Sequence, residues 1–479
     1  MKLLGLTLLL QVVIASALVM ARVIFQDPVG AFQKEVLGSK WAITMDEWLE
    51  QEATVSWDCI RRNINPPGTI RGFVAASPSK FEPDYFYTWT RDAGLVMRVV
   101  VSRYDGEKNQ GNEIKRLLHD YVAQEIYHQV TQTECDCLGE PKFNPDGSGY
   151  EGSWGRPQND GPAIRVTTLL LLAKKSSPHY VENTLLPAIL RDLDYITRVW
   201  EEPCFDLWEE VCGVHFYTLM VMRRAMVDGA EFAREFGDQK RAKAYAQTAD
   251  GILSRLDTFW SSSSNYLSVT QDHCDNVWKH SGLDTAVILA VNHAGMKPYT
   301  AGSDKILATA HRLESAFENL YPINDLHPAG LGTAIGRYPE DSYDGYASGS
   351  YGNPWFLTTA AMAELYYRAV HEWQQDKSTI ITVNDINSGF FARLFETSET
   401  QVKGLEFRYG SKAFEALLDT MTTRADRFMA TVQYHQHDNG SLSEQFNRWT
   451  GFEQGARDLT WSYASFISAA DARAGQPMP

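Results

Sequence analysis

The sequence predicts an all-α protein, and three observations support that fold class. Apolar residues recur three or four positions apart in segment after segment, whereas the alternating runs typical of strands are scarce and short. Apolar residues make up 44% of the chain and charged residues 22%, which argues against a disordered chain and against a membrane bundle. The 479 residues suffice for one large barrel or for two ordinary domains.

The helical pattern is clearest over 183–200, where Leu186, Ile189 and Leu193 fall on one stripe that is predicted to be buried. Patterns of this kind predict twelve helices, over 46–63, 91–104, 113–131, 161–176, 183–201, 213–237, 239–260, 281–294, 303–319, 353–376, 411–434 and 459–474. Twelve helices that alternate in direction can form six hairpins around a closed ring.

In such a ring, every second link between helices emerges at the same end. The links at that end are 64–90, 132–160, 202–212, 261–280, 320–352 and 435–458. Most of them are long, aromatic and rich in Gly, Pro and acidic residues, whereas the opposite links are short except for 377–410. Long loops in a compact domain usually form a binding surface, so we expect the functional site at the end with the long links.

The first two of these loops offer side chains that suit a sugar ligand. Residues 83–92 contain four aromatics, two acids and Arg91 directly before a predicted helix. Arg91 can donate forked hydrogen bonds to vicinal hydroxyls, whereas Asp92 either joins it or caps the helix. Trp154 lies between Ser153 and Gly155, where little side-chain bulk shields its ring, so we expect it to contact a ligand.

The third loop contains the first candidate for a catalytic carboxyl group. Asp206, Glu209 and Glu210 lie within five residues of one another, together with Trp208. Like charges and an apolar wall both raise the pKa of a carboxyl group, so one of the three can hold the proton of a general acid. Alternatively, these acids compensate the N-terminus of the helix that is predicted to begin near Gly213.

The last loop contains a second candidate, Glu444. Ser441 and Glu444 also fit a capping box, but no helical stripe follows them. Hydrolysis of a glycosidic bond needs one protonated and one ionised carboxyl group. Because their loops lie three hairpins apart, Glu209 and Glu444 are expected to face each other across the ring, which favours the wide gap of an inverting enzyme.

In the fifth loop, Arg337 and Asp341 pair a guanidinium with a carboxylate among tyrosines.

Charge and cysteine content limit the partners. The net charge of −16, without a run of basic residues, argues against nucleic acid, and the 13 tryptophans include rings that could stack on sugars. The Cys135–Cys137 spacing lacks the spacer of a zinc site, so no metal is expected. Cys204 and Cys212 bracket the acidic loop, where a disulfide would close a short loop, but the sequence leaves the pairing of its six cysteines open.

The N-terminus is typical of a secretory signal peptide. A positive start at Lys2, an apolar stretch over 3–14 and small-residue cleavage sites at Ala17 or Ala21 predict removal of residues 1–21. The protein is then secreted, or delivered to the lumen of the secretory pathway or vacuole, without stable membrane association. An uncleaved membrane anchor is the alternative.

In these loops the sequence resembles the fungal glucoamylases of glycoside hydrolase family 15, glucan 1,4-α-glucosidases built on an (α/α)6 barrel. The resemblance runs from about residue 40 to 474 in the family's order. It rests on PDYFYTWTRD at 83–92, GEPKFN at 139–144, GSWGRPQ-DGPA at 152–163, DLWEE at 206–210, GRYPEDSY at 336–343, NPWF at 353–356, SEQ at 443–445 and ARDLTWSYA at 456–464. It implies a single catalytic domain over 22–479 that is monomeric and needs neither a cofactor nor a metal.

The resemblance also implies roles for individual residues. Glu209 would be the catalytic acid and Glu444 the base of an exo-acting, inverting enzyme. Such an enzyme releases β-D-glucose from the non-reducing ends of starch, glycogen and maltooligosaccharides, cutting 1,4 bonds and, more slowly, 1,6 bonds. The substrate-binding residues implied are Tyr85, Trp89, Arg91, Asp92, Trp154, Gly155, Trp208, Glu210, Arg337, Asp341, Trp355 and Trp461.

Three departures from the family pattern qualify this interpretation. Phe446 replaces a tyrosine, which predicts one hydroxyl fewer near the base, and 261–280 shows little of the family pattern. No Ser/Thr-rich linker or starch-binding domain follows Ala474, so soluble glucans are expected as substrates rather than raw starch. The alternatives are an inverting hydrolase of another linkage, such as a trehalase or glucodextranase, and a non-catalytic glucan-binding domain.

Overall fold

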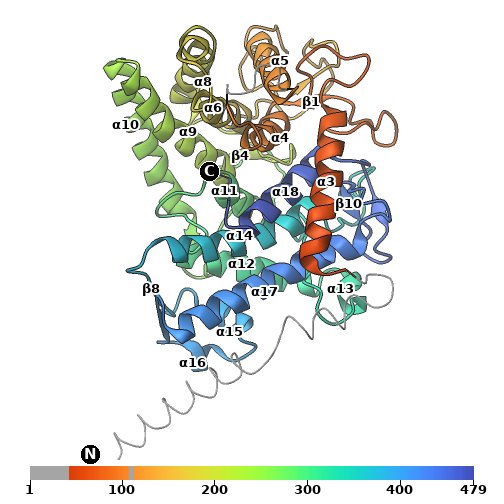
Figure 1. Ribbon diagram of the computed structural model, residues 1–479, viewed down its shortest axis with the longest axis vertical. Helices are drawn as coiled ribbons and strands as arrows, with labels where there is room; N and C mark the ends of the chain where they lie inside the picture. Colours follow the sequence, from red (N-terminus) through yellow and green to blue (C-terminus); the bar gives the residue numbers. More distant parts are fainter. Residues whose placement is uncertain (1–42, 107–112, 479) are drawn as a thin grey trace, which may run out of the picture.

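A computed structural model describes residues 43–106 and 113–478, and the predicted signal peptide over 1–21 lies outside them. Twelve long helices occupy the twelve expected segments of the described chain (Figure 1). Six of them are buried on nearly every side, as helices that line the centre of a protein must be. These inner helices are α4 (Thr90–Ser102), α6 (Asp160–Ala173), α9 (Phe216–Glu235), α11 (Ala286–Ala294), α14 (Phe356–Gln375) and α18 (Thr460–Arg473).

The inner helices form a closed ring. Each contacts the next in chain order, and α18 returns to contact α4. The six outer helices are α3 (Met45–Asn63), α5 (Glu113–His128), α8 (Leu186–Val199), α10 (Gln239–Leu256), α12 (Asp304–Glu318) and α17 (Lys412–His435). Each outer helix packs on the inner helix that precedes it around the ring, and α3 packs on α18. The predicted six-hairpin (α/α)6 barrel is therefore confirmed.

The outer helix α8 shows how the sequence pattern produces this packing. Ile189, Leu193 and Ile196 are completely buried and form the predicted stripe, whereas the opposite side of the helix faces solvent. The helix is preceded by α7 (Pro178–Tyr180) and by a π-helical turn, η1 (Val181–Leu185), so the helical region begins before the expected start at residue 183.

The long loops all lead from an outer helix into an inner one, so they open at the N-terminal ends of the inner helices. Short antiparallel strands pair within and between these loops. The pairs are β1 (Thr88–Trp89) with β2 (Lys142–Phe143), β4 (Cys212–His215) with both β3 (Cys204–Phe205) and β7 (Thr270–Gln271), β5 (Trp260–Ser261) with β6 (Tyr266–Leu267), and β10 (Gln445–Phe446) with β11 (Glu453–Gln454). Short helical turns, η2 (Asp257–Phe259) and α13 (Pro322–Leu326), lie in the same loops.

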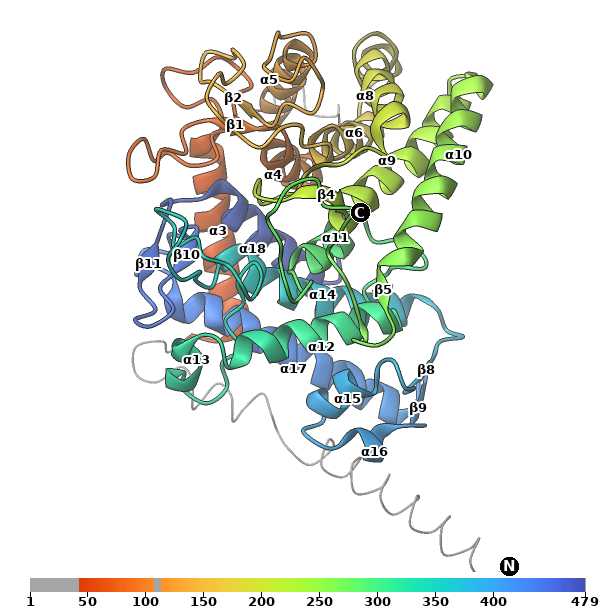
Figure 2. The ribbon, with the colours of Figure 1, turned by 180° about the vertical axis from the view of Figure 1, so that it is seen from behind.

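Pairing between these strands moves one helix boundary. The helix expected from residue 213 begins at Phe216, because Val214 pairs with Gln271 in the β4–β7 ladder. At the opposite end of the ring, the long link 377–410 contains a small subdomain. It consists of β8 (Ile380–Thr382), α15 (Ser388–Leu394), α16 (Glu399–Val402) and β9 (Glu406–Arg408), and it lies far from the site loops in Figure 2.

Two disulfides are present, Cys135–Cys137 and Cys212–Cys274, while Cys59 and Cys204 are buried free thiols. A Cys204–Cys212 disulfide is therefore wrong. The β3–β4 register places Phe205, not Cys204, opposite Cys212. Over the ranges that the structure describes, no helix is both long enough and apolar enough to cross a membrane.

Candidate active site

The long loops enclose a pocket of about 320 Å³, a volume typical of small-molecule sites. Every predicted site residue except Asp341 lines it, so one cavity collects residues from five of the six loops. The predicted residues in its wall are Tyr85, Trp89, Arg91, Asp92, Trp154, Gly155, Trp208, Glu209, Glu210, Arg337, Glu444, Trp355 and Trp461. The remaining lining residues, which were not predicted as site residues, are Ala76, Leu207, Tyr343, Ser348 and Leu459.

Glu209 lies on a tight turn that Asp206 organises. The backbone of Glu209 has a positive φ of 69°, a conformation that non-glycine residues rarely adopt outside functional sites. The Asp206 carboxylate accepts hydrogen bonds from the backbone N–H groups of Glu210 and Val211 at 2.9 and 3.0 Å. Asp206 is therefore a structural residue of the turn rather than a third catalytic candidate.

Behind this turn, Lys279 is buried between two carboxylates. Its Nζ lies 2.7 Å from Asp206 Oδ2 and 2.5 Å from Asp284 Oδ2. Burial alone would raise the pKa of Asp206, but the charge of Lys279 outweighs it and lowers that pKa to about 2. Asp284 also accepts the indole N–H of Trp208 at 2.9 Å, so the ion cluster fixes a ring of the pocket wall. Lys279 and Asp284 were not predicted as site residues, because no local pattern indicates this pairing.

The Glu209 carboxyl group receives two donors. Arg91 Nη2 lies 3.2 Å from Glu209 Oε1, and the indole N–H of Trp154 donates to Glu209 Oε2. Burial raises the pKa of Glu209 to about 7, although Arg91 opposes the shift. The guanidinium of Arg91 is itself held by Asp160 and Asp92, each 3.2 Å away. Asp92 thus lines the pocket, and Trp89 rather than Asp92 is the N-cap of α4.

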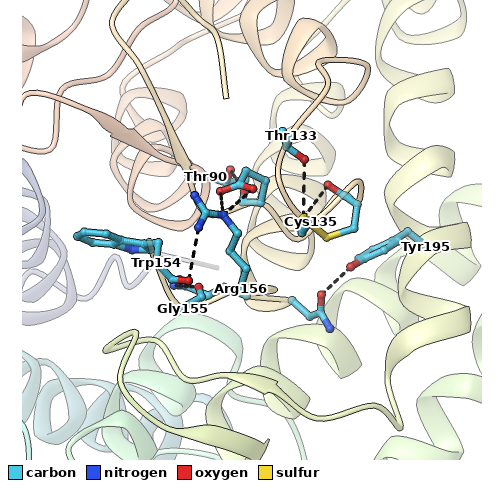
Figure 3. Close-up of a disulfide and its surroundings, with 11 residues drawn as sticks. Thr90, Thr133, Cys135, Trp154, Gly155, Arg156 and Tyr195 are labelled. Carbon is cyan, nitrogen blue, oxygen red and sulfur yellow. Dashed lines mark hydrogen bonds and ion pairs between the residues drawn. A yellow bond between two sulfur atoms is a disulfide. The ribbon is translucent and has the colours of Figure 1, made fainter. Parts of the chain in front are cut away.

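Arg156 holds the loop that carries Trp154 and Gly155 (Figure 3). Its guanidinium pairs with Glu140 at 2.7 Å and donates to the backbone oxygens of Tyr150 and Gly152 at 2.6 and 2.9 Å. Figure 3 also shows the Cys135–Cys137 disulfide in the same loop, with the Thr133 hydroxyl near one sulfur.

Gly155 and Lys142 shape the pocket wall beside Glu209. A Cβ on Gly155 would lie 2.8 Å from the Glu209 carbonyl oxygen, so only glycine allows this close approach. Lys142 Nζ lies 3.7 Å from the Trp154 ring centre and 4.8 Å from that of Trp89. Burial lowers the pKa of Lys142 to about 8. Lys142 belongs to the 139–144 motif, but its residue type alone did not indicate a place among aromatic rings.

Glu444 precedes β10, so the capping-box alternative is wrong: a strand follows it, not a helix. The Tyr85 hydroxyl donates to Glu444 Oε1 at 3.0 Å and also bonds to the Tyr343 hydroxyl at 2.8 Å. The backbone N–H of Ala456 lies 3.4 Å from Glu444 Oε2. Burial raises the pKa of Glu444 to about 8, and the Tyr85 hydrogen bond opposes that shift.

Phe446, where a tyrosine was expected, does not face the carboxyl group of Glu444. Its ring is completely buried and stacks on His435 with a centroid separation of 4.4 Å. It also packs against Phe356 at 5.0 Å. The hydroxyl beside Glu444 comes instead from Tyr85.

A second buried guanidinium completes the pocket. Arg337 forms a forked pair with Asp341, at 2.8 Å through Nε and 2.6 Å through Nη2. Its Nη2 also donates to Glu210 Oε1 at 2.8 Å. Asp341 thus lies outside the cavity wall and fixes Arg337 in it. Within the described residues, the buried indole N–H of Trp355 has no hydrogen-bond partner, which leaves a donor for a ligand.

These groups suit a neutral, polyhydroxylated ring. Fixed guanidinium and carboxylate groups can bind hydroxyls, indole rings can stack on the C–H faces of a sugar, and two buried carboxyl groups can move protons. A closed ring of helical hairpins with such a pocket at one end defines an α/α-barrel glycoside hydrolase.

Comparison with known proteins assigns the family. The pattern of Glycosyl hydrolases family 15 matches residues 54–471. Glucoamylase 1 of Rhizopus oryzae is 49% identical over 441 residues, which cover 91% of this chain and 72% of that protein. A glucoamylase of Blastobotrys adeninivorans is 37% identical, over 91% of this chain and 73% of the relative.

A solved structure agrees with these relatives. The family 15 glucoamylase from Hypocrea jecorina superposes with a TM-score of 0.82 at 33% identity, over 91% of this chain and 73% of that one. The chain belongs to glycosyl hydrolases family 15. The predicted family, fold and enzyme class are therefore confirmed.

Proposed function

We propose that this enzyme is a glucan 1,4-α-glucosidase that removes glucose units from the non-reducing ends of α-glucans with inversion, releasing β-D-glucose. The observation that carries the proposal is the shared pocket, in which two buried carboxyl groups with raised pKa values lie beside two fixed guanidinium groups. The similarity to glucoamylases along most of the chain supports the choice of substrate.

In the proposed mechanism, Glu209 acts as general acid and Glu444 as general base. Glu209 donates its proton to the glycosidic oxygen as the bond from that oxygen to C1 breaks. A water molecule attacks C1 from the opposite face and gives a proton to Glu444. The new hydroxyl is therefore β, and exchange with solvent restores both protonation states.

The donors around each carboxyl group fit these roles. The Tyr85 hydroxyl and the Ala456 N–H lie beside Glu444 and stabilise its ionised form, which a base requires. Burial raises the pKa of Glu209 to about 7 and that of Glu444 to about 8, so the catalytic form, with Glu209 protonated and Glu444 ionised, is a minor fraction of the free enzyme. Arg91, Arg337 and Glu210 would bind the hydroxyls of the terminal glucose, and Trp89, Trp208, Trp355 and Trp461 would form its apolar surroundings.

The anomer of the first product tests the reaction. Proton NMR of a maltooligosaccharide digest should show β-D-glucose appearing first, followed by slow equilibration with the α form. Internal cleavage, or α-glucose as the first product, would contradict the proposal. Trehalose and dextran serve as comparison substrates, because faster release from either would assign another linkage.

We further infer that the enzyme works as a monomer outside the cytosol, in the medium or in a vacuolar lumen, and does not bind nucleic acid. The apolar N-terminal stretch over 3–14 and the net charge of −16 support this inference. N-terminal sequencing of the mature protein from culture medium tests it, with a start at residue 18 or 22 as the expected result. Protein found only inside cells with Met1 intact would contradict export.

A further inference from the structure

Three exposed aromatic rings lie beside the pocket but do not line it. Phe452 is 77% exposed, Tyr351 63% and Trp449 47%. None of the three belongs to the pocket wall. We call this group the rim platform. Large apolar rings exposed together on a soluble protein usually mark a binding surface.

Hydrogen bonds define the turn that carries two rings of the rim platform. Trp449 and Phe452 project from the β10–β11 hairpin turn, in which Asn447 Oδ1 accepts the N–H groups of Trp449 and Thr450 at 2.9 and 3.0 Å. The N–H of Asn447 donates to the Phe452 carbonyl at 2.7 Å. The turn therefore holds both rings outward without help from a ligand.

A buried arginine fixes the rings relative to each other. Tyr351 and Trp449 meet edge to face with centroids 5.7 Å apart. The Arg448 guanidinium lies beneath both, 5.4 and 5.2 Å from their centroids, and donates to the Gly352 carbonyl at 2.9 Å. Arg448 is only 8% exposed, so the surface presents rings rather than charge. Preorganised rings lose little conformational entropy when they bind.

The rim platform continues the wall of the pocket. The segment 343–355 supplies Tyr343, Ser348 and Trp355 to the cavity and Tyr351 to the platform. The neighbouring segment supplies Glu444 to the cavity and Trp449 to the platform. Gln454 Nε2 donates to the Asp344 carbonyl at 2.6 Å, which joins the two segments, and Figure 2 shows the β10–β11 hairpin at the edge of the ring.

The composition of this surface favours a neutral ligand. Residues 345–352 and 449–452 contain no charged side chain, in a protein whose net charge is −16. They are Gly, Ser, Thr, Ala and aromatic residues, which offer hydroxyls and ring faces. Such a surface can stack on the C–H faces of sugar rings and bond to their hydroxyls, and its continuity with the pocket wall favours a glucan as the ligand.

We propose that the rim platform binds a stretch of α-glucan outside the pocket, either further along the chain whose end is being cut or on a neighbouring branch. This inference rests on the proposed function. The platform raises the affinity for long or branched glucans by tethering them, so that binding of the chain end becomes an intramolecular event. Maltose is expected to lie within the pocket, so it should gain nothing from the platform.

The test compares a short and a long substrate. In Tyr351→Ala/Trp449→Ala, KM for soluble amylopectin should rise about fivefold to tenfold, the loss of roughly 1 kcal/mol expected for stacking contacts. Both kcat and KM for maltose should stay within twofold of the parent. Trp449→Phe should retain most of the amylopectin affinity, and Tyr409→Ala, an exposed tyrosine in the opposite link, serves as matched control.

A binding assay tests the rim platform independently of the proposed hydrolytic function. In affinity electrophoresis, gels containing amylopectin should retard the parent more than the double variant. This difference should appear even if neither protein hydrolyses the amylopectin. An equal rise in KM for maltose and amylopectin, or an unchanged affinity for amylopectin, would overturn the proposal. Light scattering that shows a parent dimer and a monomeric double variant would overturn it too, by assigning the rings to a second copy of the chain.

Discussion

The two walls of the pocket hold similar carboxyl groups by different means. On the Glu209 wall, charged groups hold the carboxyl group in place. Arg91 contacts Glu209 directly, and Lys279 fixes the turn from behind through Asp206. On the Glu444 wall, neutral donors predominate. The Tyr85 hydroxyl reaches Glu444, and the backbone of Glu444 pairs with Ala456 at 2.8 Å.

This difference matters because buried charges and neutral hydrogen bonds respond differently to substitution. Removing one member of a buried ion pair leaves an uncompensated charge, whereas removing a neutral hydrogen bond costs about 1 kcal/mol. The Glu209 wall should therefore be fragile and the Glu444 wall tolerant, although the proposed mechanism requires both carboxyl groups.

The largest expected effect distinguishes the roles of the two carboxyl groups. Glu209→Gln and Glu444→Gln should each lower kcat on maltose by about 10³-fold or more, because each removes one proton transfer. With α-D-glucosyl fluoride, Glu209→Gln should recover most of its activity, since fluoride leaves without a proton. Glu444→Gln should remain inactive on both substrates.

Equal responses of the two variants to the fluoride would contradict the assignment of acid and base. Circular dichroism and thermal unfolding of both variants should match the parent, because each glutamine is close in shape to the glutamate it replaces. A variant that fails to fold would require the comparison to be repeated with Glu→Ser.

The next effect concerns the stability of the Glu209 wall. Lys279→Met should lower the free energy of unfolding by about 3–5 kcal/mol, because Asp206 and Asp284 are left buried without their cation. Ser462→Ala, which removes a hydrogen bond of 2.9 Å to the Ser443 carbonyl behind Glu444, should cost about 1 kcal/mol. Thermal unfolding measures both, and a larger loss for Ser462→Ala would reverse the ranking of the walls.

The pH dependence of kcat/KM gives a smaller but more specific test. Tyr85→Phe removes a donor that stabilises ionised Glu444, so the pKa of Glu444, at about 8 the higher of the two, rises and the high-pH limb moves to higher pH. Trp154→Phe removes a donor to Glu209, so the pKa of Glu209, at about 7 the lower of the two, rises and the low-pH limb should move to higher pH. Each shift should be about half a unit to one unit. Movement of the opposite limb in either variant would reverse the order of the two pKa values.

The smallest expected effect is on the pH dependence of stability, through a carboxyl group behind the Glu444 wall. Glu52 on α3 is buried, accepts the Ser56 hydroxyl at 2.9 Å, and has its pKa raised by burial to about 8. Because the folded state holds this proton more tightly, stability contributed by Glu52 is complete below the unfolded pKa near 4.5 and falls as pH rises towards 8. Glu52→Gln should remove this decline.

Thermal unfolding between pH 4 and 9 checks that expectation. The difference in Tm between Glu52→Gln and the parent should increase in favour of the variant by about 2–3 °C from pH 4 to pH 9. This is the shift expected for a few kcal/mol of stability in a chain of this size. A difference that stays constant with pH would show that Glu52 does not titrate in this window.

The helices of this fold could be predicted from the sequence because their apolar stripes are local. All twelve expected segments are helical, and the ring followed from their number and from the alternation of long and short links. The candidate site was also accessible, because residues such as Trp154 and Glu209 stand in loops whose composition does not suit a core. Family motifs then distinguished them from helix caps.

What the sequence could not provide are contacts between distant segments. Lys279 reaches Asp206 across 73 residues, and no local pattern predicts that pairing. The positive φ of Glu209 and the Cys212–Cys274 disulfide depend equally on the folded loops. Phe446 shows the same limit, since its neighbours in space decide that its ring enters the core.

The contacts that join the two ends of the chain have a consequence for the order of folding. Asn63 Nδ2 donates to Thr460 Oγ1 at 2.8 Å, across 397 residues of sequence, and Tyr85 reaches Glu444 across 359. Contacts between residues so far apart form slowly, because a long loop must close first. Synthesis from the N-terminus delivers Glu209 long before Glu444, so a nascent chain can build most of the helical wall before the two carboxyl groups of the proposed mechanism meet. Hydrolytic activity should therefore appear only in the last kinetic step, when α18 docks between α3 and α4.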